Sequence, residues 1–265
     1  PFFNYYLKDK GSLQLPEAYV FETGSNVWKT YEQWPPKNAT TRMFYLHPNG
    51  KLALEKPVNH AAQEYDEYVS DPNKPVPFIN GVAIGMTREY MVEDQRFAAH
   101  RPDVLVYQSE LLTENVTIAG PITATLYVST TGSDSDWIVK VIDVLPDNTP
   151  DNPNTSAGVR MGGYQMLVRG EPMRAKFRES FSEPKPMTAG KITKIEFTMP
   201  DINHTFLKGH KIMVQVQSSW FPLVDRNPQQ FLDIYNAKES DFQKATQRVY
   251  HSEEFSSHLK VKVLP

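Results

Sequence analysis

The chain has 265 residues, with 40% hydrophobic and 22% charged residues, as expected of an ordinary globular protein of one large or two smaller domains. Its formal net charge of −3 gives no reason to expect a nucleic-acid partner or an anionic membrane surface. Cysteine is absent, which excludes disulfides, thiolate metal sites and cysteine nucleophiles. No apolar run reaches the roughly 18 residues of a membrane helix.

The N-terminus is rich in apolar and aromatic side chains, namely Phe2, Phe3, Tyr5, Tyr6 and Leu7. Lys8 and Gly11 follow, which fits the last turns of a helix with a cation near its end and a glycine just beyond it. The segment lacks the basic and apolar regions of a signal peptide. Because so apolar a stub needs a partner to cover it, we expect further protein upstream.

Most of the chain shows short runs typical of β-strands, separated by turn signals. Strands are predicted at residues 18–23, 27–31, 42–46, 51–54, 104–107, 115–130, 137–145, 163–168, 191–199, 211–219, 247–250 and 258–263. Residues 48–50 (PNG) predict a hairpin turn, and residues 237–246 predict one or two helical turns. Residues 56–103 are irregular and too long for a plain loop, and such loops often carry function. The whole pattern predicts an all-β sandwich.

One strand stands out within residues 206–226, FLKGHKIMVQVQSSWFPLVDR. Gly209 supplies a tight turn, after which two sets of side chains alternate. One set is Ile212, Val214 and Val216, and the other is Met213, Gln215 and Gln217. The alternation predicts an antiparallel strand with one face buried, and Pro222 lies past its end because proline cannot donate to a ladder.

The chain contains no G-x-S-x-G pentapeptide, the nucleophile elbow of many serine hydrolases. The nearest match, residues 132–136 (GSDSD), lacks the closing glycine and is interpreted as a plain turn. The histidines show no metal-ligand spacing, and His204 and His210, which flank a turn, are interpreted as structural. The acidic stretch at residues 134–147 lacks the EF-hand pattern for calcium. The residues therefore predict no catalytic group, metal site or cofactor in this chain.

The stretch at residues 206–226 resembles the signature of the C-terminal β-sandwich domain of X-Pro dipeptidyl-peptidase and cocaine-esterase-like acyl hydrolases. It is most similar to the α-amino-acid ester hydrolase and glutaryl-cephalosporanic-acid acylase branch. Further matching stretches occur in the expected order, namely FFxYYLK, PEAYVFETG, WPP, FYLHPNGKL, DPNKPVP and DQRF. Together they span nearly the whole chain, and as a set they are specific.

The resemblance implies jelly-roll connectivity, which periodicity alone cannot choose. It implies that residues 1–12 end an upstream α/β-hydrolase domain and that residues 13–265 form the jelly-roll domain. The complete enzyme would be a serine hydrolase of esters or amides of small acyl or α-amino-acyl groups. Its Ser, Asp and His would lie upstream of Pro1, so this chain alone would be inactive. Self-association and export to the periplasm or the medium are expected on the same basis.

The resemblance also indicates candidate site residues. In cocaine-esterase-like relatives, a segment shortly before the D-Q-R stretch lines the acyl pocket from the sandwich side. Carried over by position, this segment falls on Ile84 and Gly85, and Met86, Tyr90 and Met91 are neighbours that could face the same pocket. The alternative is that these residues only pack the loop onto the sandwich.

We therefore expect a C-terminal accessory domain that shapes the acyl pocket and the domain interface of an acyl hydrolase. The alternative is a freestanding carbohydrate-binding or adhesion β-sandwich module. That module would need exposed aromatic platforms, for which Trp28, Trp34 and Trp220 are the candidates. We interpret these tryptophans instead as residues of the core or of a domain interface.

Overall fold

The computed structural model describes residues 2–58, 64–85, 87–153 and 158–265, and these residues are mostly β-strand. The strands are β1 (Ala18–Glu22), β2 (Val27–Tyr31), β3 (Thr40–His47), β4 (Lys51–Ala53), β5 (Tyr65–Ser70), β6 (Val104–Gln108), β7 (Val116–Thr130), β8 (Asp136–Val144), β9 (Gln165–Arg174), β10 (Thr193–Phe206), β11 (Lys211–Gln217), β12 (Ala245–Tyr250) and β13 (His258–Val263). The helices are α1 (Phe2–Lys8) and α2 (Arg96–Ala99), with short 3₁₀ turns η1 (Pro48–Gly50), η2 (Glu89–Met91), η3 (Ala175–Phe177), η4 (Ile234–Asn236) and η5 (Glu239–Asp241). Within the described ranges, no helix is long and apolar enough to cross a membrane.

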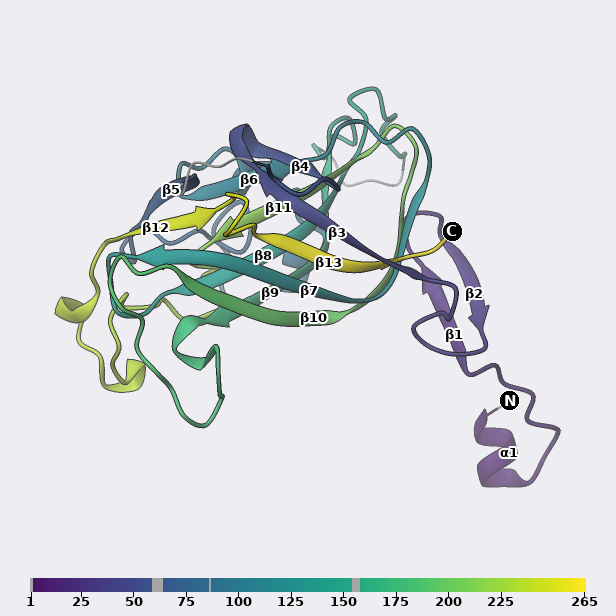
Figure 1. The fold of residues 1–265 in the computed structure, drawn as a ribbon. Coiled ribbons are helices and arrows are strands. Elements are labelled where there is room, and N and C mark those ends of the chain that lie inside the picture. Colours follow the sequence, from purple (N-terminus) through teal and green to yellow (C-terminus); the bar gives the residue numbers. More distant parts are fainter. Residues whose placement is uncertain (1, 59–63, 86, 154–157) are drawn as a thin grey trace.

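The strands of the main sheet fold into two layers (Figure 1). Among the described residues this sheet has 11 strands, in the order β5-β12-β7-β13-β3-β4-β6-β11-β8-β9, and β10 pairs with β7 outside that path. In Figure 1, β7, β10, β12, β13 and β3 form the near layer, and β6, β11, β8 and β9 lie behind them. A short parallel contact between β4 and β6 connects the layers. The fold is thus the all-β jelly-roll sandwich with a short N-terminal helix that the sequence predicted.

The core lies between the two layers and follows from the alternation seen in the sequence. The inward side chains of β7 are Ile122, Ala124, Leu126 and Val128, and all are fully buried. Those of β11 and β8 include Val214, Val216, Trp137 and Val139, which are also fully buried. Each large apolar side chain buried in this way contributes about 1.5–3 kcal/mol. The sandwich therefore has a large core of its own.

The prediction of a single buried face on β11 is wrong. Gln215 and Gln217 are as completely buried as Val214 and Val216. The reason is tertiary, because the chain between β5 and β6 covers the outer face of the back layer. The Gln215 amide donates to the Gln95 carbonyl of that segment at 3.3 Å, so its polar group is partly satisfied under the cover.

Four other elements differ from the sequence prediction. Within residues 56–103, which were expected to be irregular, β5 (Tyr65–Ser70) pairs with β12 along its whole length. The strand β10 continues past Pro200 to Phe206 by a shift of register between Met199 and Ile202. Strand β9 extends to Arg174, well beyond the predicted end at residue 168. Of the helical turns predicted at 237–246, the structure shows only the 3₁₀ turn η5.

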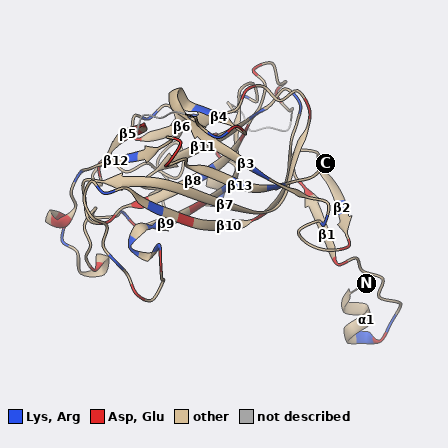
Figure 2. Cartoon of the chain, viewed as in Figure 1, with Lys and Arg blue, Asp and Glu red and all other residues tan. Residues whose placement is uncertain are grey.

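The hairpin β1–β2 and α1 stand at one end of the sandwich, where both termini also lie (Figure 1). Thr23 fastens the hairpin to β10, since its N–H donates to the Asn203 carbonyl at 3.0 Å and its carbonyl accepts from the Thr205 N–H at 2.9 Å. Gly24 has φ +84°, and a Cβ there would lie 2.0 Å from the Thr205 carbonyl oxygen. In Figure 2, α1 is uncharged except at the end that carries Lys8. The hairpin is therefore held in a fixed direction, whereas α1 buries none of its side chains.

Candidate functional site

The segment between β5 and β6 is bound to the outer face of the back layer by both backbone and apolar contacts. The Phe78 N–H donates to the Phe221 carbonyl, and the Phe221 N–H donates to the Val76 carbonyl, each at 2.9 Å. Phe78, Ile138 of β8 and Trp220 form a buried apolar cluster beneath the segment. We call residues 71–103 the covering segment.

The Asp94-Gln95-Arg96 stretch anchors the end of the covering segment to β9. The Gln95 N–H donates to the Gln165 carbonyl at 3.0 Å, and an Asp94 carboxylate oxygen accepts the Gln165 N–H at 3.2 Å. Arg96 forms an ion pair with Asp94, and its guanidinium donates to the Gly162 carbonyl at 3.0 Å. The D-Q-R stretch therefore attaches the end of the covering segment to β9 and to the loop before it. The helix α2 begins directly after Gln95.

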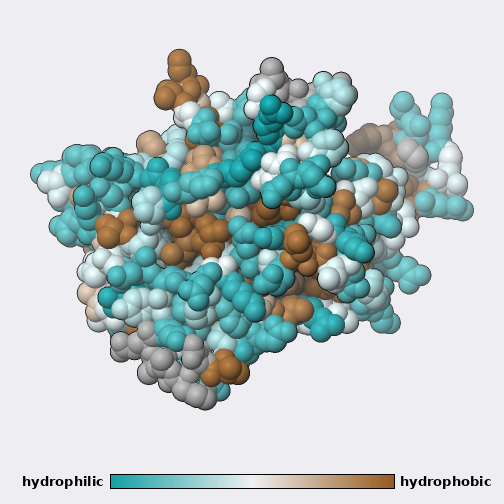
Figure 3. Space-filling model, turned by 90° about the horizontal axis from the view of Figure 1, so that it is seen from above, coloured by the Kyte–Doolittle hydropathy of each residue, from teal (hydrophilic) through white to brown (hydrophobic). Residues whose placement is uncertain are grey.

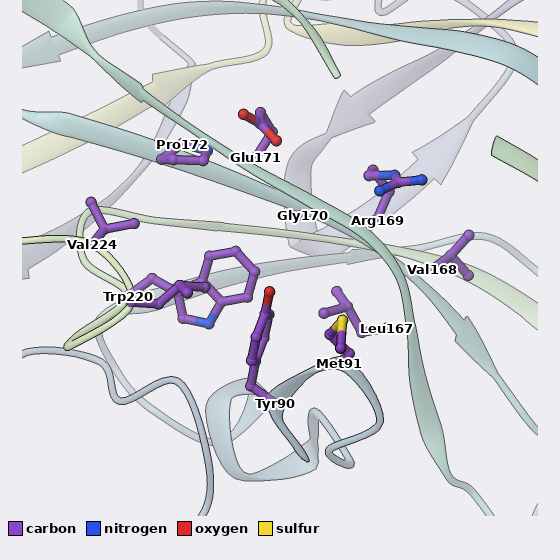
Figure 4. A pocket seen from close by; sticks show the side chains of 11 residues that line it. Tyr90, Met91, Leu167, Val168, Arg169, Gly170, Glu171, Pro172, Trp220 and Val224 are labelled. Atoms are coloured by element: carbon purple, nitrogen blue, oxygen red, sulfur yellow. The ribbon is translucent and has the colours of Figure 1, made fainter. Parts of the chain in front are cut away.

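A cavity of about 370 Å³ lies between the covering segment and β9 (Figure 4). Tyr90 and Met91 of η2 form one wall, and Trp220 forms another, with the Tyr90 and Trp220 rings edge to face at 5.8 Å. The indole lies directly against β9 because residue 170 is glycine: a Cβ there would lie 2.7 Å from Trp220 Cη2. Leu167 lies on the same side of the strand as Tyr90 and Trp220, so these walls are mainly apolar (Figure 4).

The predicted site residues separate into three groups. Tyr90 and Met91 line this cavity, and their assignment to an acyl pocket stays a prediction. Ile84 and Gly85 do not line it: the Ile84 side chain is fully exposed at the tip of the covering segment. Met86 lies outside the described residues. The sequence analysis did not assign Gly170 or Trp220 to the site, although a lone glycine within a strand pattern is a recognised sign of close approach.

The polar groups around the cavity are few. Glu171 and Arg169 project from the opposite side of β9 from Trp220 and Tyr90 (Figure 4), and burial raises the pKa of the Glu171 carboxyl. The indole N–H of Trp220 is buried without a hydrogen-bond partner among the described residues. The cavity can therefore receive an apolar group with a small number of hydrogen-bond acceptors.

The two histidines interpreted as structural share one buried carboxylate. Asp143 Oδ1 lies 2.8 Å from His210 Nδ1, and Oδ2 lies 3.3 Å from His204 Nε2. The Thr23 hydroxyl lies 2.8 Å from His204 Nδ1. These contacts connect the hairpin, β10, β8 and the turn before β11, which agrees with a structural role.

Asp136, in the acidic stretch, is paired with an arginine. Arg174 donates to both oxygens of the buried Asp136 carboxylate at 2.8 Å each, and the Asn227 amide donates to Asp134 and Asp136 at 3.2 and 2.9 Å. Burial, together with the Asp136 carboxylate, raises the pKa of Asp134 to about 6. Across residues 2–58, 64–85, 87–153 and 158–265, no group of three or more acidic or histidine side chains is placed to hold a metal.

The tryptophans also differ in their surroundings. Trp220 is buried, in agreement with the core interpretation. Trp34 donates its indole N–H to Asp201 at 2.6 Å. Trp28 is 58% exposed on the hairpin, where its ring stacks on Tyr19 at 4.7 Å. The interpretation of Trp28 as a domain-interface residue stays a prediction.

Comparison with known proteins shows that the chain is similar in sequence and fold to parts of larger proteins. The chain is 29% identical over 257 residues to the cocaine esterase of Rhodococcus sp. (strain MB1 Bresler), a match that covers 94% of this chain and 42% of the esterase. An aminopeptidase from the marine sediment archaeon Thaumarchaeota archaeon matches 100% of this chain with a TM-score of 0.92 and 43% identity. An alpha-amino acid ester hydrolase matches 99% of it with a TM-score of 0.90 and 44% identity.

This chain covers 43% of each of those two solved chains, and so spans less than half the length of the relatives it matches. The family model described as the X-Pro dipeptidyl-peptidase C-terminal non-catalytic domain matches residues 10–260. That match extends from the end of the N-terminal helix to the last strand. The chain therefore belongs to the X-Pro dipeptidyl-peptidase C-terminal non-catalytic domain family.

Proposed function

We propose that this chain is the accessory β-sandwich of a serine acyl hydrolase and forms one wall of its acyl pocket. The catalytic Ser, His and Asp of the proposed enzyme lie upstream of Pro1, in an α/β-hydrolase domain. The full 265-residue sequence contains no G-x-S-x-G elbow, which supports this division of labour. The proposed substrates are esters or amides of small acyl or α-amino-acyl groups, the class that the names of the relatives indicate.

The observation that carries the proposal is the apolar tip of the covering segment. Val82 and Ile84 are fully exposed, and Val92, at the other end of the tip, is 67% exposed. Apolar side chains reach the surface in separate patches among hydrophilic residues on the face shown in Figure 3. An exposed apolar tip beside a mainly apolar cavity fits a second domain that covers it, with a small acyl group between them.

The N-terminal arm supports a second contact with the same domain. Tyr19, Phe21 and Trp28 lie on one face of the hairpin, each at least 39% exposed, with Trp28 opposite Phe21 in the strand pairing. The aromatic residues of α1 are exposed as well. Exposed aromatic groups held on a fixed hairpin are typical of interface anchors. We propose that residues 1–12 belong structurally to the upstream domain.

The test uses the full-length gene product and a series of esters with one alcohol and acyl groups of increasing size. Ile84→Trp should narrow the proposed acyl pocket between the tip and the upstream domain. It should reduce kcat/KM for the larger acyl groups at least tenfold more than for acetyl, since a lost apolar contact or a steric clash is worth about 1–3 kcal/mol. Phe181→Ala, at another solvent-exposed apolar residue on a different loop, is the control and should leave the ratio unchanged. An Ile84→Trp enzyme with the wild-type acyl preference would contradict the proposed wall.

The rival function, carbohydrate binding, rests on the exposed Trp28–Tyr19 stack, because such a stack could hold a sugar ring. Calorimetric titration of the full-length gene product with a broad glycan panel distinguishes the two. We expect no heat of binding. Binding that Trp28→Ala abolishes, while ester hydrolysis is unchanged, would support the carbohydrate function instead.

A further inference from the structure

Lys140 is a fully buried lysine that the proposed function leaves unused, and it lies against Trp220, one of the residues that line the cavity. It lies on the outer face of β8, beneath the covering segment, between Gln215 of β11 and Gly170 of β9 in the strand register. Its Nζ donates to Gln95 Oε1 at 3.0 Å and lies 4.9 Å from the centre of the Trp220 ring. In the part of the chain that the structure describes, no carboxylate lies within ion-pair distance of it. A methionine or leucine would fill this position without the cost of burying an amine, so packing alone does not account for the lysine.

The hydrogen-bond acceptor of Lys140 is the residue that fixes the covering segment. Besides the contact of its Oε1 with Lys140, Gln95 forms two backbone hydrogen bonds to the sheet. Its N–H donates to the Gln165 carbonyl, and its carbonyl accepts from the Gln215 side-chain amide. Its own amide group donates to the Glu93 carbonyl at 2.8 Å within the segment. Lys140 also supports Trp220, which is in contact with Tyr90 across the cavity. The Lys140 amine therefore contacts both Gln95, which attaches the covering segment to the sheet, and Trp220, which forms a wall of the cavity.

We propose that Lys140 is a proton-coupled latch, in which the neutral amine holds Gln95 and Trp220 on the sheet and opening of the covering segment is accompanied by protonation of Lys140. In the closed state the neutral amine donates one hydrogen bond, to Gln95 Oε1. The protonated ammonium has three N–H donors, and the same acceptor can take up only one of them there. Opening lets water solvate the others. The latch is a property of this chain, and only its effect on the acyl pocket rests on the proposed function.

Burial alone lowers the pKa of Lys140 from 10.5 to about 7 in the closed state. In the open, hydrated state the ordinary value returns, so the open state binds more protons between pH 7 and 10.5. Opening therefore becomes more favourable as pH falls through this range and levels off below about pH 7. The two values give an opening equilibrium about 50-fold larger at pH 7.0 than at pH 9.0, and about 10-fold larger if the buried pKa lies one unit higher.

The groups that pack around Lys140 do not produce this dependence. Its direct neighbours Gln95, Gln215, Gly170 and Trp220 carry no charge. The charged residues next to them are Glu93, Asp94 and Arg96 on the segment and Arg169 and Glu171 on β9, and His100 follows at the end of α2. Burial raises the pKa of the Glu93 and Glu171 carboxyl groups, and the comparison with Lys140→Met separates their titration from that of Lys140.

The test is hydrogen exchange with mass spectrometry on the full-length gene product, for peptides that cover residues 89–99. Labelling times are shorter at pH 9.0 than at pH 7.0, so that an unprotected amide would exchange to the same extent at both pH values. In the wild type, protection should be about 10- to 50-fold lower at pH 7.0, and Lys140→Met should remove this ratio because methionine cannot titrate. Lys260→Met, at an exposed lysine of β13, is the matched control and should keep the wild-type ratio.

The proposal would be overturned if the wild-type protection at pH 9.0 exceeded that at pH 7.0 by less than about threefold. It would also be overturned if Lys140→Met showed the same ratio of protection as the wild type. If Lys140→Met does not fold, Lys140→Gln takes its place, because glutamine keeps an N–H donor for Gln95 but has no titration in this range. Exchange is measured without substrate, so the result stands even if the proposed hydrolase function fails.

Discussion

The packing of Trp220 on Gly170 offers a sharp test of how the cavity is built. In Gly170→Ala the new Cβ would lie 2.7 Å from Trp220 Cη2 and 3.0 Å from Cζ3, about 1 Å closer than carbon atoms pack. Overpacking of this kind costs about 1–3 kcal/mol. Alanine recovers about 0.4–1 kcal/mol because it restricts the unfolded chain more than glycine does. We expect a net loss of about 1–2 kcal/mol in the free energy of unfolding.

A double-mutant cycle isolates this contact from other effects of the alanine. Trp220→Phe removes the outer atoms of the indole with which the Cβ would clash, so Gly170→Ala should cost almost nothing in that background. The assay is urea unfolding followed by far-ultraviolet circular dichroism for the wild type, the two single variants and the double variant. The expected coupling energy is about 1–2 kcal/mol. An equal cost of Gly170→Ala in both backgrounds would refute the geometry on which the cavity depends.

Three further substitutions test other parts of the structure. Arg174→Met should lower the free energy of unfolding by about 3–5 kcal/mol because it removes the arginine partner of the buried Asp136 carboxylate. Arg160→Met breaks an exposed ion pair and should lower it by at most about 1 kcal/mol. Similar losses for the two variants in urea unfolding would be inconsistent with the buried pair. Gly24→Ala should make the hairpin more sensitive to limited proteolysis. Gly11 has a similar φ but no neighbouring atoms within 4 Å, so Gly11→Ala should not change the cleavage rate. Equal cleavage of the two variants would argue against the contact between the hairpin and β10. The Asp134 pKa is raised from 3.8 to about 6, so its contribution to stability is complete below about pH 4 and is lost as pH rises through 6. The stability of Asp134→Asn relative to the wild type should therefore rise by up to about 3 kcal/mol between pH 4 and 7, and a constant difference would exclude this burial effect.

Local patterns predicted most of the strands because they record which side chains face the core. The alternation along β7 identified Ile122, Leu126 and Val128 as inward, and all three are fully buried. Strand β5 gave no such signal, since its sequence YDEYVS is mostly polar and its pairing partner β12 lies far along the chain. Turn residues marked the strand ends well, as at Asn49, which has the positive φ that the hairpin turn requires.

The candidate site was predictable only in part because it is made by tertiary cover. Tyr90 and Met91 were named from a family resemblance, and the cavity they line also depends on Trp220 and Gly170, which are distant in sequence. A polar residue on the outer face of a strand normally predicts solvent exposure. The covering segment reverses that expectation for Lys140, and no local pattern in β8 records it.

We propose that the catalytic residues of the complete protein lie upstream of this chain. The most direct measurement is mass spectrometry of the native gene product after labelling with a fluorophosphonate, which reacts with activated serines. We expect one labelled serine, located before Pro1 in a protein much longer than 265 residues. A labelled serine within residues 1–265, or a native product that begins at Pro1 and takes no label, would contradict this expectation.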